Sequence, residues 1–324
     1  MAGVPSNAAV TYTTVAVSGS AGANLGFGPN LGPGITFQSF DSWPMLNSSG
    51  VVAFRARVAG SGTNPGFNLG IWSYDGNTLQ AVARAGSAGP LPNVEAGMNT
   101  FAGMGEPVLN DDGMVAFVGS LDSDITTSTK NSGIWTNASG SLAVVAREGT
   151  PGPGPNLGSQ ITYSDFIDVN PVFNTAGKVA FHADITVNGV TNTTGNYTGF
   201  WSNATGSLAL VARGGTAGTN PQVGAGNNFY DFEDPVLNDA GKVAFKASLA
   251  LGDSGTLVGS GIWSNVGGTL QPVASTQGVG PGPGLGVGVS FAGLDKPIIN
   301  NDGKIAFSAR VSGTGIHGGN DTGI

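Results

Sequence analysis

Five carboxylates recur at matching places along the chain and are the side chains best suited to do chemistry. Each follows a Phe-x-x-(Phe/Met/Leu) segment, with Tyr in place of the first Phe in the third copy, within two residues and precedes a Pro-x-(Leu/Phe/Ile) segment. They are Asp41, Glu106, Asp168, Asp234 and Asp295. If these carboxylates converge on an axis, they could bind a hard cation such as Ca²⁺, or two of them could cleave a glycosidic bond. A simpler interpretation, which we favour, is that each accepts backbone N–H bonds where a loop enters a strand.

Other side chains that could catalyse a reaction are scarce. The two histidines, His182 and His317, lie in different parts of the chain without the spacing of a metal site, and the chain has no cysteine. No Gly-x-Ser-x-Gly segment accompanies them, and the glycine-rich segments lack a following helix that could hold a phosphate. We therefore predict no catalytic residue and no cofactor, with Ca²⁺ at the ring of acids as the single alternative.

Aromatic residues fall into a repeated and a non-repeated group. A Trp recurs at one position, as Trp72, Trp135, Trp201 and Trp263, and a Phe recurs at another. Large side chains at equivalent positions predict packing between repeats. Aromatic residues outside these series are better candidates for a ligand surface. They are Trp43, Tyr74, Tyr163, Tyr197 and Tyr230.

The elements that must position these residues are repeated five times. The motif Asn-x-x-Gly-x-(Val/Ile)-Ala-Phe recurs every 62 to 64 residues. Its copies begin at Asn47, Asn110, Asn174, Asn238 and Asn300. Pro-x-(Leu/Phe/Ile) precedes each copy, and Gly-(Ile/Phe)-Trp and Leu-x-x-Val-Ala-(Arg/Ser) follow the first four. Short apolar segments bounded by Gly, Asn, Asp and Pro predict four strands per repeat, and Asn-x-x-Gly predicts a tight hairpin between the first two.

A self-similar chain of four-stranded antiparallel units predicts an all-β fold, a five-bladed β-propeller in one domain spanning residues 1–324. The fifth repeat reaches Gly323-Ile324, the beginning of a third strand, whereas Tyr12 to Gly19 matches the fourth-strand segment Leu142 to Gly149. We predict that this N-terminal strand completes the last blade and closes the ring. The same strand could be donated to a neighbouring molecule, giving a head-to-tail assembly in place of a monomer.

The repeat resembles a known family. Tandem Asn-x-x-Gly-x-x-Ala-Phe copies over nearly the whole chain are similar to the bacterial exported proteins named after that motif, which typically carry C-terminal surface-sorting tags. More distantly, Pro-x-Leu-Asn-x-x-Gly-x-Val-Ala-Phe resembles the repeat of TolB-like propellers. The first resemblance implies a location outside the cell or on its surface, and the second implies that the Pro-x-Leu strand is innermost. Neither implies an activity.

Composition narrows the classes of partner. Lys and Arg number 12 against 20 Asp and Glu, a net charge of −8, and no basic cluster suited to nucleic acid is present. No apolar run approaches the ~20 residues of a membrane span. Residues 1–5 do not read as a signal peptide. We predict a non-enzymatic exported scaffold that binds an unknown ligand or plays a structural role. The alternatives are a lectin-like propeller that binds glycans or other cell-surface components and, third, a glycoside hydrolase.

Overall fold

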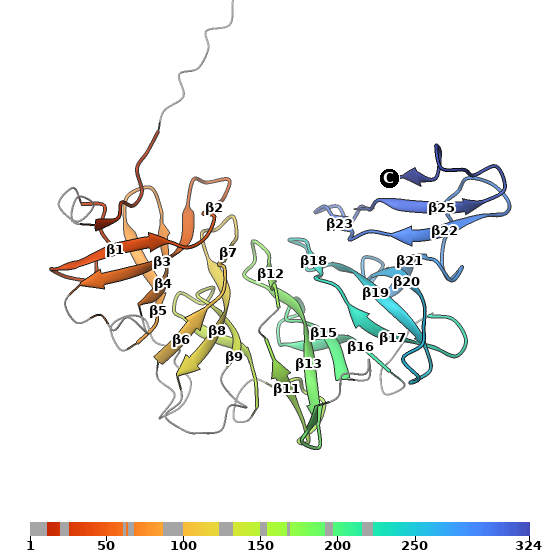
Figure 1. Ribbon diagram of the computed structural model, residues 1–324, viewed down its shortest axis with the longest axis horizontal. Coiled ribbons are helices and arrows are strands. Elements are labelled where there is room, and N and C mark those ends of the chain that lie inside the picture. Colours follow the sequence, from red (N-terminus) through yellow and green to blue (C-terminus); the bar gives the residue numbers. More distant parts are fainter. Residues whose placement is uncertain are drawn as a thin grey trace, which may run out of the picture.

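The structure is a computed structural model that describes residues 12–19, 26–60, 63, 68–86, 100–122, 132–149, 154–166, 169–191, 197–215 and 223–324. Regular structure in this part of the chain is almost entirely β. Consecutive strands form five successive groups, which we call sheets 1 to 5 (Figure 1). No helix in the described ranges is long and apolar enough to span a bilayer.

Each sheet corresponds to one copy of the sequence repeat. Sheet 1 contains β1 (Ile35–Phe40), β2 (Met45–Leu46), β3 (Val52–Gly60), β4 (Leu69–Tyr74) and β5 (Leu79–Arg84). Sheet 2 contains β6 (Thr100–Met104), β7 (Val108–Leu109), β8 (Val115–Asp122), β9 (Ser132–Thr136) and β10 (Ala143–Arg147). Sheet 3 contains β11 (Ile161–Asp165), β12 (Val172–Phe173), β13 (Val179–Val187), β14 (Val190–Thr191), β15 (Thr198–Ser202) and β16 (Ala209–Arg213). Sheet 4 contains β17 (Asn227–Phe232), β18 (Val236–Leu237), β19 (Val243–Leu251), β20 (Leu257–Ser264) and β21 (Gln271–Ser275). Sheet 5 contains β22 (Val289–Leu294), β23 (Ile298–Ile299), β24 (Ile305–Ala306), β25 (Ala309–Gly313) and β26 (Thr322–Gly323).

The topology of the first four sheets is the same. In sheet 1 the order is β1-β3-β4-β5, all antiparallel, and the short β2 pairs with the start of β3. The segment from β1 to β2 is therefore one bent first strand, and the repeated four-stranded antiparallel sheet predicted from the sequence is confirmed. The short strands β2, β7, β12, β18 and β23 contact one another in succession. They line the inner side of the arc of sheets (Figure 1), as predicted for the Pro-x-Leu segments.

The first half of this bent strand differs from the expectation drawn from the sequence. A loop was expected before the inner strand, where the structure has β1 and its counterparts in the other sheets. Register shifts interrupt the pairing of β1 with β3 between Phe37 and Ser39, and they recur in sheets 2 to 5. Such a bulge breaks the period-2 alternation that marks a strand. It also brings Phe37 and Phe40 into contact, with ring centroids 5.2 Å apart, although they are three residues apart in the chain.

The repeated Asn forms the predicted hairpin and also links neighbouring sheets. In sheet 2 the N–H of Gly113, which has φ 81°, donates to the carbonyl of Asn110 at 3.1 Å, and Asn110 Oδ1 accepts the N–H of Met114 at 2.8 Å. The Nδ2 group of each Asn then donates at 2.9 Å to the main-chain carbonyl of the Asn in the next sheet. These bonds run Asn47 to Asn110, Asn110 to Asn174, Asn174 to Asn238 and Asn238 to Asn300. We call this series the asparagine ladder.

Apolar packing joins each sheet to the next. One face of sheet 2 presents Phe101, Phe117 and Trp135, which cluster with Ile71 and Ala83 on the facing side of sheet 1. Corresponding clusters join sheets 2 and 3, 3 and 4, and 4 and 5. Trp135, Trp201 and Trp263 are fully buried in these clusters, so the predicted packing between repeats is confirmed for them. Trp72 is buried against sheet 1 and the N-terminal segment.

The N-terminal segment lies against sheet 1. Ser18 forms a parallel bridge with Phe37, just as Ala85 after β5 bridges Phe101 and Glu148 after β10 bridges Tyr163. Val15 and Ala16 pack on the aromatic face of sheet 1. Residues 12–19 therefore lie beside sheet 1 in the same place that the end of β5 takes beside sheet 2 and the end of β10 takes beside sheet 3. In Figure 1, sheets 1 and 5 lie at the two ends of the arc and stand apart.

Candidate ligand pocket and the repeated acids

The repeated acids do not share one backbone position. The N–H groups of Asp41, Gly105, Glu233 and Asp295 make the same bond, to the carbonyl of the residue that follows the repeated Phe. Asp41 and Asp295 are therefore equivalent, whereas Glu106 and Asp234 lie one residue later in their sheets. Asp168 lies outside the described residues. Equivalence of all five acids, on which the predicted ring rests, does not hold for the four that are described.

These carboxylates contact basic and polar side chains. Asp41 accepts a hydrogen bond from Ser39 at 2.7 Å and pairs with Arg57 at 2.7 Å. Further contacts of Glu106 and Asp234 cross between sheets. They are Arg55 to Glu106 at 3.0 Å, His182 to Asp234 at 3.5 Å, Lys296 to Asp234 at 3.7 Å and a hydrogen bond from Asn170 Nδ2 to Asp234 at 3.3 Å. The side chain of His182 is half-buried at this contact. In the described part of the chain, no group of three or more His, Cys, Asp or Glu side chains could hold a metal ion.

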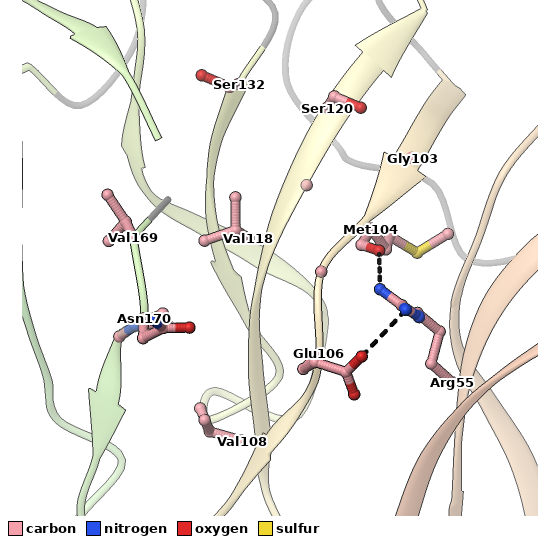
Figure 2. A pocket seen from close by; sticks show the side chains of 13 residues that line it. Arg55, Gly103, Met104, Glu106, Val108, Val118, Ser120, Ser132, Val169 and Asn170 are labelled. Atoms are coloured by element: carbon pink, nitrogen blue, oxygen red, sulfur yellow. Dashed lines mark hydrogen bonds and ion pairs between the residues drawn. The ribbon is translucent and has the colours of Figure 1, made fainter. Parts of the chain in front are cut away.

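A pocket of about 390 Å³ opens between sheets 2 and 3, beside Arg55 of sheet 1 (Figure 2). Its wall includes Glu106, Val118, Ser120 and Asn170. Figure 2 shows Val118 and Val169 on one side and the Arg55–Glu106 pair on the other. The site is therefore half apolar and half polar.

Two facing positions beside the pocket differ from sheet to sheet. In sheet 4, Glu233 and Lys246 occupy the two facing positions and their charged atoms are 2.6 Å apart. In sheet 2 the corresponding residues are Gly105 and Val118, whose backbone N–H and carbonyl make the same 2.8 Å bond. Sheet 2 therefore has two small, uncharged residues at these positions, and both line the pocket. Sheets 1 and 5 have Asp41 with Arg55 and Asp295 with Ser308 at the same positions.

The polar side of the pocket is held in place by Arg55. Its Nη2 atom lies 3.0 Å from Glu106 Oε1, and its Nη1 atom donates to the carbonyl of Met104 at 3.0 Å. Its Nε atom is buried and has no hydrogen-bond partner among the described residues. Glu106 is the single carboxylate in the described lining. Hydrolysis of a glycoside normally uses two carboxyl groups. Asp168, which precedes the lining residue Val169, lies outside the described residues.

Comparison with known proteins places the chain in a family. A family model described as a family of unknown function, DUF7453, matches residues 13–223 and 216–324. The chain belongs to this family. No curated protein has significant sequence similarity to it.

Solved structures similar to this DUF7453 chain include carbohydrate-active enzymes. An oligogalacturonate lyase in complex with manganese is 12% identical, with 89% of this chain and 80% of that chain covered and a TM-score of 0.33. An α-L-arabinanase of Penicillium chrysogenum complexed with arabinobiose is 10% identical over 84% and 74%, with a TM-score of 0.31. The native Bacillus subtilis arabinanase Arb43A is 11% identical over 89% and 95%, with a TM-score of 0.25. Likeness at this level carries no conclusion on activity.

The five aromatic residues predicted as a ligand surface are dispersed over this DUF7453 fold. Trp43 is 90% exposed between β1 and β2, and the hydroxyl of Tyr74 donates to the carbonyl of Gly76 at 2.7 Å. Tyr197 and Tyr230 are half-buried in sheets 3 and 4. None of the five lines the pocket described above.

Tyr163 is a core residue and not part of a surface. It is 1% exposed, and its ring centroid lies 5.0 Å from that of Trp201, just as Phe37 lies 5.0 Å from Trp72. Burial raises the pKa of its hydroxyl far above the usual value. Sheets 1, 2, 4 and 5 have Phe at this position. The change to Tyr gave Tyr163 the appearance of a residue outside the repeat.

Sequence reasoning also missed a set of buried arginines. Arg84, Arg147 and Arg213 stand at the ends of β5, β10 and β16 and are at most 9% exposed. Burial lowers the pKa of Arg84 and Arg213. The signal was present in Val-Ala-Arg, where a charged residue ends an apolar strand. These side chains are buried in the interior and are not among the described residues that line the pocket.

Proposed function

We propose that the chain is a non-enzymatic scaffold of the exported type, a five-bladed propeller whose ligand binds in the pocket between sheets 2 and 3. The observation that carries this proposal is the replacement of the Glu233–Lys246 pair of sheet 4 by Gly105 and Val118 in sheet 2. These two positions vary among the sheets, and in sheet 2 their small side chains border the pocket. The single carboxylate of the described lining is paired with Arg55, which favours binding over catalysis.

Closure of the five sheets into a ring is part of this proposal. Asn110, Asn174 and Asn238 are 4% exposed, and each both donates to and accepts from a ladder neighbour. At the ends of the ladder, Asn47 has no described donor from a preceding Asn, and Asn300 has no described acceptor for its Nδ2 group. A ring would bring the two together and would place residues 12–19 beside β26, where sheet 5 has an open edge. An unpaired edge is costly in solution because it invites aggregation. Exchange of this strand between molecules would satisfy the same groups head to tail.

A carbohydrate is the second candidate ligand. The pocket offers the Ser120 hydroxyl and the Asn170 Oδ1 atom for sugar hydroxyls, since Asn170 Nδ2 donates to Asp234 at 3.3 Å. Val118 and Val169 are available for the C–H faces of a sugar ring. Small-molecule sites generally combine such apolar walls with a few placed polar groups. Hydrolysis would require a second carboxylate beside Glu106, which the described lining does not supply.

A glycan array and a transplanted ion pair test the proposal together. The double variant Gly105→Glu/Val118→Lys copies the sheet 4 pair into the pocket, and a Cβ atom at Gly105 would meet its nearest neighbour at an ordinary 3.5 Å. We expect the variant to fold and to lose binding of any glycan that the wild-type chain retains. Leu251→Glu/Leu257→Lys, at two exposed positions of sheet 4, makes the same change of charge away from the pocket and is the matched control. Cleavage of a polysaccharide by the wild-type chain, lost in the pocket variant alone, would contradict the non-enzymatic proposal.

A further inference from the structure

Two carboxylates bond to side chains that line the pocket between sheets 2 and 3. Asp234 accepts a hydrogen bond from Asn170 Nδ2 at 3.3 Å, and Glu148 Oε2 accepts one from Ser132 Oγ at 3.0 Å. Asn170 and Ser132 belong to the described lining, whereas Asp234 and Glu148 contact them from outside it. An ionised carboxylate only accepts hydrogen bonds, so each bond fixes which atom of the lining residue donates. The two carboxylates therefore determine what these lining residues can offer to a ligand.

Asn170 presents an oxygen atom to the pocket. Its Nδ2 atom is turned to Asp234, and Figure 2 shows its side-chain oxygen directed toward the side of the pocket that holds Glu106. The opposite orientation of the amide would place Oδ1 against the Asp234 carboxylate, where two acceptors face each other without a hydrogen. Asp234 is itself held by His182 at 3.5 Å and by Lys296 at 3.7 Å. Asn170 is therefore oriented as an acceptor for a ligand.

Ser132 presents the lone pairs of its hydroxyl. The single O–H hydrogen goes to Glu148, whose Oε2 atom also accepts the Ser132 N–H at 3.3 Å. The backbone N–H of Glu148 makes a bond that recurs in sheets 1, 3 and 4, where the residue is Ala85, Gly214 or Thr276. Burial of a carboxylate is unfavourable, and Glu148 is 7% exposed. The other three sheets fold without a carboxylate here, so its presence in sheet 2 calls for a role at the pocket.

The side chains of the described lining therefore offer mainly acceptors. Besides Asn170 Oδ1 and Ser132 Oγ, the lining has the Glu106 carboxylate, of which Oε1 pairs with Arg55. Arg55 is the charged donor, and its Nη1 and Nη2 atoms already bond to the carbonyl of Met104 and to Glu106. An anionic or carbonyl-rich ligand would bring further acceptors against these oxygens. A ligand that carries N–H and O–H donors matches the lining.

We propose that the pocket binds an amino sugar through its protonated amino group. An ammonium group has three donors and no acceptor. It bonds to Asn170 Oδ1 and to the Glu106 carboxylate, and a hydroxyl of the same sugar donates to Ser132 Oγ. Asp234 and Glu148 are positioning residues, and the net charge of −8 favours a cationic ligand over an anionic one. This inference rests on the binding role proposed for the pocket and names the class of ligand.

Titration calorimetry with three methyl glycosides tests the class of ligand. They are the glycosides of glucosamine, N-acetylglucosamine and glucuronate, measured at a pH at which the sugar amine is protonated. The N-acetyl sugar loses the charge and gains a carbonyl acceptor, and glucuronate carries a carboxylate. We expect saturable binding of the glucosamine glycoside. Its affinity should exceed that of the other two by roughly tenfold or more, a step of about 1.4 kcal/mol.

The variant Asp234→Asn tests the positioning role. An amide at this position can donate as well as accept, so Asn170 can turn its nitrogen toward the pocket. The ratio of the affinities for glucosamine and N-acetylglucosamine should fall by about threefold, an effect of the size of one hydrogen bond. Glu233→Gln is the matched control, because it removes the same charge one residue away, where the partner is Lys246 at 2.6 Å. It should leave the ratio unchanged, and thermal unfolding checks that both variants are folded.

The outcomes separate this inference from the binding role on which it rests. Tighter binding of either other glycoside, blocked by Gly105→Glu/Val118→Lys, would overturn the amino sugar and leave the pocket as a binding site. Glucosamine binding that this double variant does not block would contradict both. An equal fall of the affinity ratio in Asp234→Asn and Glu233→Gln would overturn the positioning role, since charge alone would then explain it. Binding of none of the three glycosides would overturn the amino sugar.

Discussion

At the scale of single residues, the described interior is built from a small set of side chains used at equivalent places. Phe117 and Trp135 of sheet 2 are 0% exposed and stack with centroids 6.4 Å apart, and they contact the face of sheet 1. Each such aromatic belongs to its own sheet and to the interface with the preceding one. Removal of one side chain should therefore weaken the packing of two sheets.

Trp135→Ala is expected to lower the free energy of unfolding by about 3 to 5 kcal/mol, because it removes a fully buried side chain and leaves a cavity. Chemical denaturation gives this quantity directly. Trp43→Ala is the matched control, since Trp43 is 90% exposed and its loss should change stability little. A Trp135→Ala chain as stable as the wild type would mean that the indole contributes no packing.

Asp239 links the turns of neighbouring sheets and gives a pH-dependent prediction. Its Oδ1 atom accepts the N–H of Thr175 at 2.8 Å, and its Oδ2 atom accepts a bond from Asn301 at 2.7 Å. Hydrogen bonds from Thr175 hold the pKa of this carboxyl below its ordinary value of 3.8. A lowered pKa in the folded state means that the contribution to stability is present above pH 3.8 and is lost as the pH falls below it.

The variant Asp239→Asn lacks this carboxylate and should be less stable than the wild type at neutral pH. The difference in free energy of unfolding between the two chains should shrink as the pH is lowered to below 3.8. Urea unfolding of the two chains at a series of pH values measures this difference. If the difference stays the same across the series, the carboxylate does not have the lowered pKa.

At the scale of elements, the predictable features are those that neighbouring residues determine. Asn-x-x-Gly specifies its hairpin through a side-chain acceptor and a left-handed glycine, and Val-Ala-Phe and Gly-Ile-Trp read as strands from local composition. The bulge at Phe37 to Ser39 hides β1, because the apolar residues fall three apart in place of two. The pocket could not be predicted, since its lining comes from three sheets and from residues far apart in the sequence.

The asparagine ladder was also invisible in the sequence. A tight turn is enough to explain every Asn of the motif. No neighbouring residue in the sequence shows that the side-chain amide also donates a hydrogen bond to a carbonyl 62 to 64 positions away. Alignment of the acids failed for a similar reason. Ser42 and Trp43 both separate Asp41 from its Pro, whereas Glu106 alone separates Gly105 from its Pro, so the offset shows only once backbone bonds are compared.

Asn174→Asp keeps the acceptor but removes the donor of one rung, and it places a carboxylate beside the Asn238 carbonyl. Loss of a buried hydrogen bond of this kind should cost about 1 to 3 kcal/mol of unfolding free energy. Asn77→Asp, in the exposed turn between β4 and β5, makes the same chemical change and should cost little. An equal effect of the two substitutions would mean that the ladder does not hold the sheets together.

At the scale of the whole molecule, the proposed closure of the five sheets into a ring explains the repeated sheet interfaces and the place of the N-terminal segment together. Every sheet interface in the described structure repeats one pattern, an aromatic face against an Ile- or Phe-containing face with an Asn rung at the inner edge. The N-terminal segment already occupies the outer-strand place relative to sheet 1. A ring of five sheets lets this pattern continue from sheet 5 to sheet 1.

Closure also predicts which residues meet. In sheet 2, Ala146 of the outer strand pairs with Ile134 of the third strand. Ala16 corresponds to Ala146 and Ile324 corresponds to Ile134, so these two should be cross-strand partners in the ring. Opposed residues of this kind lie within the Cα separation that a disulfide accepts.

The most direct test is therefore oxidation of the variant Ala16→Cys/Ile324→Cys, which is unambiguous because the chain has no cysteine of its own. Non-reducing electrophoresis and size-exclusion chromatography at several concentrations distinguish bonds within a chain from bonds between chains. The account predicts an intramolecular disulfide in a monomer and a higher melting temperature than the reduced form. Two free thiols after oxidation, or disulfides between chains alone, would contradict closure of the ring within one molecule.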